Sequence, residues 1–113
     1  MSAYEIPVLR FSAEAAADIN RRRFVMINSD GKGVEATAAE QAIGVSLNDP
    51  KSGEVLEIID GIVMVEASAE IAAGASVEVA AGGKAVTATS GDVVGIAITA
   101  AGGDEELLAV KLK

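Results

Sequence analysis

The chain has 113 residues, of which half are hydrophobic, and a formal net charge of −8 at pH 7. This length predicts one domain with a single core, and the acidic balance argues against a nucleic-acid partner, because phosphate binding depends on clustered Lys and Arg. The chain contains no Cys and no His, which excludes disulfides and thiolate sites and removes the commonest metal ligand and general base. We therefore expect a protein that is not an enzyme and that uses no cofactor and no metal.

Residues 1–12 are expected to form an N-terminal arm that precedes a single β-barrel domain over residues 13–113. Pro7 opposes a helix here and favours an extended chain. The segment contains the aromatic residues Tyr4 and Phe11 and the apolar residues Ile6 and Val8. Two interpretations stay open: the segment is a first strand of the barrel, or it is a partly free arm that becomes ordered on a partner. No long apolar run indicates a signal peptide or a membrane span.

Residues 12–20 (SAEAAADIN) predict a short helix, since Ser12 is a good N-cap residue and Ala and Glu follow it. The triplet Arg21, Arg22 and Arg23 comes directly before a strand pattern. It is either a solvated junction or an ion-pairing contact for an acidic partner surface, because the planar guanidinium pairs well with carboxylates.

From residue 22 onward the pattern is that of short strands. Asp30-Gly31, Asp60-Gly61 and Gly82-Gly83 are typical of tight turns between strands. Further strands are expected over residues 34–37, 42–47, 53–59, 62–67, 76–80, 93–99 and 107–113. About nine short strands with tight turns predict an all-β fold, a small barrel or sandwich.

The most informative feature is an internal repeat. GKGVEATAAEQAIGVSL begins at Gly31 and GKAVTATSGDVVGIAI begins at Gly83, 52 positions later. Two copies are too few for a solenoid, so they are interpreted as half-repeats of one closed body, over about residues 20–59 and 72–113. Gly44 and Gly95 occupy matching positions inside predicted strands, which indicates a bulge, a bend or the close approach of another backbone.

Other kinds of functional site fit the sequence less well. The Asp residues lie in or beside predicted turns, where the side chain caps backbone NH groups. Gly82-Gly83-Lys84 lacks the spacing of a phosphate loop, and the context of this lysine differs from that of lipoyl and biotinyl carriers. A non-catalytic ligand-binding barrel, with residues 48–53 and 100–105 on one rim, and a self-assembling structural barrel both remain alternatives.

The repeated G-x-A-V-x-A…V-G-[IV]-[AS] pattern over residues 20–113 resembles the small capsid decoration, or cement, proteins of tailed bacteriophages and prophages. The resemblance implies a small β-barrel, made in the bacterial host cytoplasm, on the outer surface of the expanded shell in the virion. It implies homotrimers that bridge major capsid protein subunits and stabilise the shell, with no nucleic-acid or membrane partner. The residues expected to contact the capsid are Tyr4, Ile6, Val8, Phe11, Arg21, Arg22 and Arg23.

Overall fold

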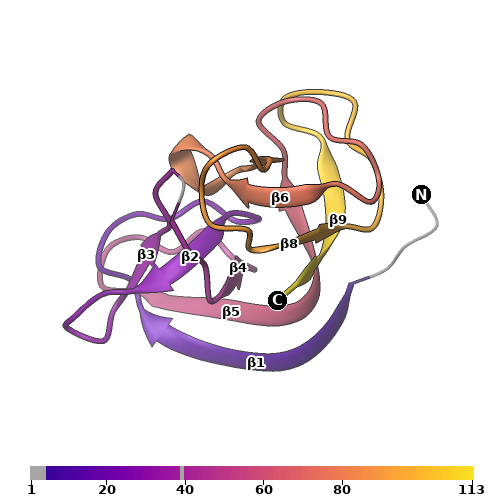
Figure 1. Ribbon diagram of the computed structural model, residues 1–113. Coiled ribbons are helices and arrows are strands. Elements are labelled where there is room, and N and C mark those ends of the chain that lie inside the picture. Colours follow the sequence, from indigo (N-terminus) through magenta and orange to yellow (C-terminus); the bar gives the residue numbers. More distant parts are fainter. Residues whose placement is uncertain (1–4, 39) are drawn as a thin grey trace.

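The computed structural model describes residues 5–38 and 40–113, and it shows a protein built almost entirely from strands (Figure 1). In these residues nine strands form one curled sheet, which confirms the predicted all-β fold class. The strands are β1 (Ile6–Glu14), β2 (Phe24–Ile27), β3 (Gly33–Glu35), β4 (Gly44–Ser46), β5 (Val55–Glu66), β6 (Ser76–Val79), β7 (Ala85–Thr87), β8 (Gly95–Ala97) and β9 (Leu107–Leu112). A 3-10 turn, η1 (Ala81–Gly83), links β6 to β7.

The short helix predicted for residues 12–20 is wrong. Residues 12–14 continue β1, Ala15 forms an isolated bridge with Gly33, and the remainder consists of bends and irregular chain. The helix propensity of Ala and Glu is a weak local preference. Here it is overridden by pairing with β5 and by burial of Ala15 and Ile19, which are 1% and 3% exposed. No helix in the described part of the chain is long and apolar enough to cross a membrane.

The strand order is symmetric about the centre of the sheet, running β3-β2-β4-β5-β9-β8-β6-β7. β1 adds to β5 through eight antiparallel residue pairs. Ile58 and Ile59 of β5 pair both with β4 and with β1. A strand has only two edges, so β1 and β4 lie on opposite edges of β5. Figure 1 shows β1 following the curve of β5 along the outside of the molecule.

The tight turn predicted at Asp60-Gly61 is wrong, because β5 runs through it as one strand of 12 residues. The first part of β5 pairs with β4 and its last part, Ile62–Glu66, pairs with β9. Gly61 adopts φ 121°, a conformation that side chains disfavour, where the two parts meet. We call the strands up to Ile59 the first half and those from Asp60 onward the second half.

The internal repeat is present in the strand pairing. Val25 pairs with Gly44 in the first half, and the equivalent Val77 pairs with Gly95 in the second. The hairpins predicted at Asp30-Gly31 and Gly82-Gly83 connect β2 to β3 and β6 to β7. Both close with the same hydrogen bond, from Asn28 N to Lys32 O and from Ala80 N to Lys84 O, at 2.8 and 2.7 Å.

The structural repeat also includes β1, which lies upstream of the repeated motif. Phe11 pairs with Ile58 in β1 and β5, as Val63 pairs with Val110 in β5 and β9. β1 is therefore the first-half equivalent of the last part of β5. The sequence carries a signal for this, since EAAADI at residues 14–19 matches EASAEI at residues 66–71.

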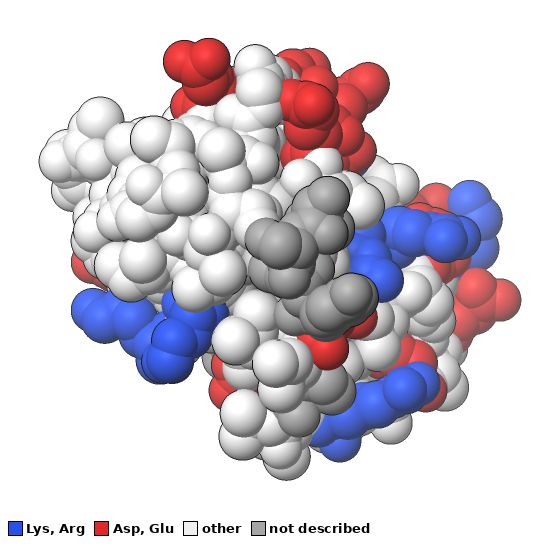
Figure 2. All heavy atoms as spheres, turned by 90° about the vertical axis from the view of Figure 1, so that its right-hand side faces the viewer, with Lys and Arg blue, Asp and Glu red and all other residues white. Residues whose placement is uncertain are grey.

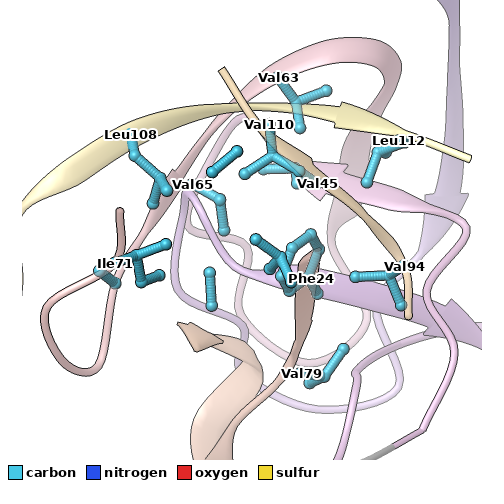
Figure 3. Close-up of a cluster of buried hydrophobic side chains, with 14 of the residues drawn as sticks. Phe24, Val45, Val63, Val65, Ile71, Val79, Val94, Leu108, Val110 and Leu112 are labelled. Carbon is cyan, nitrogen blue, oxygen red and sulfur yellow. The ribbon is translucent and has the colours of Figure 1, made fainter. Parts of the chain in front are cut away.

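Two clusters of buried side chains hold the sheet together. One lies inside the first half and contains Ala15, Ile19, Val25, Leu56 and Ile58. The other fills the second half and continues across to the first, where Phe24, Val45 and Ile59 join it (Figure 3). Because this larger cluster takes side chains from both halves, it joins them into one body.

Of the bulge, bend or close backbone approach expected at Gly44 and Gly95, the structure shows the close approach. A Cβ added to Gly44 would lie 2.5 Å from the carbonyl oxygen of Ile59, and one added to Gly95 would lie against the equivalent carbonyl of Lys111. Each glycine thus allows its short strand, β4 or β8, to lie against the long strand beside it.

Candidate functional site

The N-terminal contact residues predicted from sequence lie mostly on one exposed strand edge. Ile6 and Val8 in β1 are 57% and 82% exposed, and their neighbour Leu9 is 54% exposed. Phe11 points the other way and packs against the first-half cluster. Tyr4 lies outside the described residues. In the described residues β1 pairs only with β5, so its outer edge carries no strand.

An apolar groove of about 320 Å³ lies beside the start of β1. It is lined by Ile6, Val8, Asp60, Gly61, Ile62, Lys111, Leu112 and Lys113. Ile6 and Val8 were predicted as contact residues, whereas no sequence pattern indicated the groove or its wall formed by Ile62 and Leu112. Ile62 pairs directly with Ile6, and Leu112, from the far end of the chain, lies near β1 because β5 continues past Gly61 to pair with β9.

Gly61 sets how closely β1 approaches β5. A Cβ at this position would lie 2.6 Å from the carbonyl oxygen of Ile6 and 2.7 Å from the amide nitrogen of Val8. The β1–β5 register is irregular between Pro7 and Leu9, next to this contact. An irregularity of this kind redirects the edge strand, and here it leaves Val8 the most exposed large apolar residue among those described.

Glu5 fixes the beginning of β1 to both halves. One of its carboxylate oxygens accepts a hydrogen bond from the Met64 amide at 3.1 Å and forms an ion pair with Arg22 Nη1. The side chains of Glu5 and Arg22 are about one quarter exposed. Ion pairs shielded from solvent in this way are screened less than fully exposed ones. The start of β1 is thus held at its place beside β5.

The arginine triplet lies at the junction between the halves, where all three guanidinium groups pair within the chain. Arg21 pairs with Asp49 at 2.8 Å, and Arg23 pairs with Glu66 at 2.8 Å. Arg23 Nη1 also donates to the carbonyl of Gly82 at 3.0 Å, which links β2 to the β6–β7 hairpin. The interpretation of a simply solvated junction is therefore wrong for Arg22 and Arg23, while Arg21 remains 65% exposed.

Two carboxylates, Asp49 in a loop and Glu78 in β6, accept hydrogen bonds from backbone groups of distant loops. The backbone NH and the side chain of Arg21 both bond to Asp49, and these bonds lower the pKa of that carboxyl. The backbone NH of Thr89 donates to Glu78 at 2.9 Å and its hydroxyl at 3.0 Å, and these bonds lower the pKa of Glu78. The Asp49 contact agrees with the expectation that Asp residues near turns cap backbone NH groups, and the Glu78 contact ties the loop at Thr89 to β6.

The rim suggested for a ligand-binding barrel is not formed as expected. A pocket of about 520 Å³ adjoins residues 100–102, but its other lining residues are Glu70, Ile71, Ala72 and Thr87. None of these comes from residues 48–53, so the loops expected to share one rim do not line this pocket together. Within the described residues, no group of three or more Asp or Glu side chains is placed to hold a metal ion.

Charge is unevenly distributed over the side of the molecule that faces right in Figure 1. Figure 2 shows a group of acidic side chains at the top of this side, further acidic side chains next to basic ones at the right and below, and an uncharged surface at the upper left. The uncharged area is available for contacts with a partner that do not involve ion pairs.

Comparison with known proteins finds one matching family and a similar solved structure. A family model described as phage cement protein matches residues 5–112. The head fiber gp8.5 N base of bacteriophage phi29 has a similar structure, with a TM-score of 0.78, 19% sequence identity and 93% of each chain covered. At this identity the similarity shows a shared fold. A comparison with curated proteins found no match.

The family match confirms the resemblance drawn from the repeated motif. It begins at residue 5 and so includes β1, the strand that lies upstream of that motif. It ends at residue 112 and so includes both halves of the sheet. On this match, the chain belongs to the phage cement protein family.

Proposed function

We propose that this protein decorates the outer surface of an expanded phage shell and stabilises it by bridging neighbouring major capsid protein subunits. Family membership implies a structural protein that associates with the phage capsid in the virion. The outer surface, the major capsid protein as partner, the stabilising effect and a homotrimeric state are the steps that we add. The role requires no catalytic group, cofactor, nucleic acid or membrane.

The exposed edge of β1 is the observation that carries this proposal. An unpaired strand edge with exposed apolar residues is prone to uncontrolled pairing, and soluble proteins usually protect such edges. Here Ile6, Val8 and Leu9 are more than half exposed and adjoin an apolar groove. An extended capsid segment that adds to β1 as a further strand would receive main-chain hydrogen bonds, while the groove would receive its side chains.

The arginines and the first residues complete the proposed contact surface. Arg21 is the most exposed arginine of the triplet, and it would pair with a capsid carboxylate while Asp49 orients it. Arg22 and Arg23 would contribute mainly by holding Glu5 and the second half in place. Tyr4, at the entry to β1, remains a proposed contact.

Stabilisation of a shell follows from selective binding. A protein that binds only the assembled, expanded state shifts the equilibrium toward that state by mass action. Several weak contacts made by one linked decoration unit reinforce each other, because each contact raises the effective concentration of the others.

The test measures binding of the purified protein to expanded shells of its phage by co-sedimentation. Val8→Lys places a charge at the groove and should weaken binding at least tenfold. Val55→Lys is the matched control, because Val55 is also an exposed valine, 59% accessible, at the far end of the β1–β5 pair. Equal affinity of Val8→Lys and the parent, or equal binding to expanded and unexpanded shells, would contradict the proposal.

A further inference from the structure

The two halves pack against each other asymmetrically, although they are alike. Phe24, Val45 and Ile59 form what we call the first-half face, which the second half covers; these residues are 0%, 0% and 2% exposed. The repeat assigns their equivalents as Ser76, Ile96 and Lys111, which we call the second-half face. Ile96 is 41% exposed and Lys111 is also exposed.

The β6–β7 hairpin contacts the first-half face at Phe24. Gly83 is buried, and a Cβ built on it would lie 2.8 Å from the carbonyl oxygen of Phe24 and 3.2 Å from the Cβ of Arg23. Arg23 also donates to the carbonyl of Gly82. In Figure 3, Phe24 lies within the cluster that also contains Val79 and Val94 of the second half.

The equivalent hairpin of the first half, residues 28–32, lacks this contact. Gly31 has the same left-handed conformation as Gly83, with φ 77° against 79°. Yet Gly31 is exposed, and a Cβ built on it meets no described atom within 4 Å. The hairpin is nevertheless ordered, because the Asn28 side chain accepts hydrogen bonds from the amides of Asp30 and Lys32, both at 3.0 Å.

The contact between the halves is therefore head-to-tail, with a hairpin of one half on a face of the other and no reciprocal contact. A contact of this kind leaves one hairpin and one face unused, and such surfaces form rings or filaments when copies of a molecule associate. We infer that a second copy of this chain completes the pattern: the 28–32 hairpin of one copy docks on the second-half face of the next.

The chemistry of the two surfaces fits a reversible contact between copies. Ser76 and Lys111 replace Phe24 and Ile59, which keeps the second-half face soluble in a single copy, while Ile96 and Ile98 remain as apolar contacts, 41% and 42% exposed. Lys111 on the face and Asp30 on the hairpin have opposite charges. Among the described residues, neither has an ion-pair partner within 4.0 Å.

The number of copies in the ring rests on the proposed function, because it is taken from the proposed homotrimer. The contact itself does not depend on capsid binding. It can therefore be tested on the full-length protein in the absence of shells.

The chain contains no cysteine, so an engineered disulfide reports a single contact. A Cβ built on Gly83 would lie 3.2 Å from the Cβ of Arg23, close to the 3.5–4.5 Å typical of disulfides. The equivalents of Gly83 and Arg23 in the proposed contact are Gly31 and Ala75. Gly31→Cys mixed with Ala75→Cys should give a disulfide-linked dimer under mild oxidation. The double variant should give linked species up to the trimer and none larger.

The control pair is Gly53→Cys with Ala75→Cys, because Gly53 is a second exposed glycine with positive φ and an open surrounding. Two results together would overturn the head-to-tail contact. One is cross-linking no greater than in this control, and the other is a sedimentation mass of one copy at a protein concentration on the order of 100 μM. Linked species that continue beyond three copies would retain the contact but overturn the trimeric ring. If the cysteine variants cross-link as expected but the parent protein does not bind expanded shells, the proposed function is wrong and the head-to-tail contact stands.

As an independent measurement, Ile96→Glu should raise the dissociation constant for self-association at least tenfold by sedimentation. Leu107→Glu is the control. Leu107 has the same size as Ile96 and a similar exposed fraction, 46%, but it is not part of the second-half face. Equal weakening by both variants would contradict the assignment of this face.

Discussion

Two residues other than glycine adopt positive φ in the described part of the chain, Arg22 at 61° and Glu105 at 69°. The repeat pairs each of them with a glycine in the other half. Arg22 corresponds to Gly74 at φ 85°, and Glu105 corresponds to Gly53 at φ 87°. The backbone conformation therefore belongs to the architecture of both halves, whereas the residue type differs between them.

This pairing predicts effects of opposite sign at equivalent positions. Gly53→Ala should lower the free energy of unfolding by about 1 kcal/mol, because a side chain disfavours the left-handed region. Glu105→Gly removes the same strain, offset by about 0.5–1 kcal/mol of extra chain entropy, and should be neutral or slightly stabilising. Chemical denaturation of both variants measures the difference. A loss of stability in Glu105→Gly as large as in Gly53→Ala would contradict this account.

Glu78 predicts a pH dependence of stability. Its hydrogen bonds with Thr89 hold the pKa of the carboxyl below the ordinary value of 4.5 in the folded state. A lowered folded-state pKa adds stability that is fully present above pH 4.5 and is lost as the pH falls through the folded-state pKa. Glu78→Gln should therefore be less stable than the parent at pH 7, and the difference should shrink as the pH falls below 4.5. Urea midpoints at pH 7, 5, 4 and 3 test this, and a constant difference would exclude it.

At this scale the sequence predicted the role of some residues and not of others. Gly44 and Gly95 could be identified because the same residue recurs at the same position within an apolar strand. The conformation of Arg22 could not, since arginine carries no preference for positive φ. Its ion pair with Glu5 also joins residues that no sequence pattern connects.

The strand β5 shows how tertiary pairing overrides a local signal. Asp-Gly is a strong hairpin signal, so residues 60 and 61 were expected to form a turn. In the structure β1 and β9 pair on opposite edges at Ile62, and they hold the chain extended through Gly61. The EAAAD segment failed as a helix for the same reason, because partners distant in sequence decide its conformation.

The close approach at Gly61 predicts local release of β1. Gly61→Ala would bring a Cβ against the backbone of Ile6 and Val8, so the start of β1 should separate from β5. Hydrogen exchange should rise at the amides of Ile6 and Val8 and stay near the parent value at residues 10–14, whose pairing lies farther from Gly61. Uniform protection along β1 would show that the strand adapts without detaching.

At the scale of the whole molecule, the fold class followed from local patterns but the packing of the halves did not. Short strands and tight turns are visible in sequence because they depend on neighbouring residues. A signal for the asymmetry was nevertheless present: FVMI of β2 is apolar on both faces, whereas SVEV of β6 alternates. Phe24 at the start of β2 is buried, whereas Ser76 at the equivalent position of β6 is partly exposed.

The shared core predicts that the two halves unfold together. Gly44→Ala and Gly95→Ala each force a Cβ onto a neighbouring carbonyl, and overpacking of this kind costs about 1–3 kcal/mol. Each variant should lower the midpoint of one unfolding transition. Circular dichroism and calorimetry should give the same midpoint for that transition. Gly103→Ala is the control, because a Cβ there meets no described atom within 4 Å. Separate transitions for the two variants would show that the halves are independent.

The continuity of β5 has a mechanical consequence. A tensile force that draws the two halves apart passes along the covalent backbone of this strand, from its pairing with β1 and β4 to its pairing with β9. The hydrogen bonds that flank it are loaded in shear, so many must break together, and no strand can be peeled from its end one bond at a time. The molecule should therefore act as a short, inextensible tie between whatever its two halves hold.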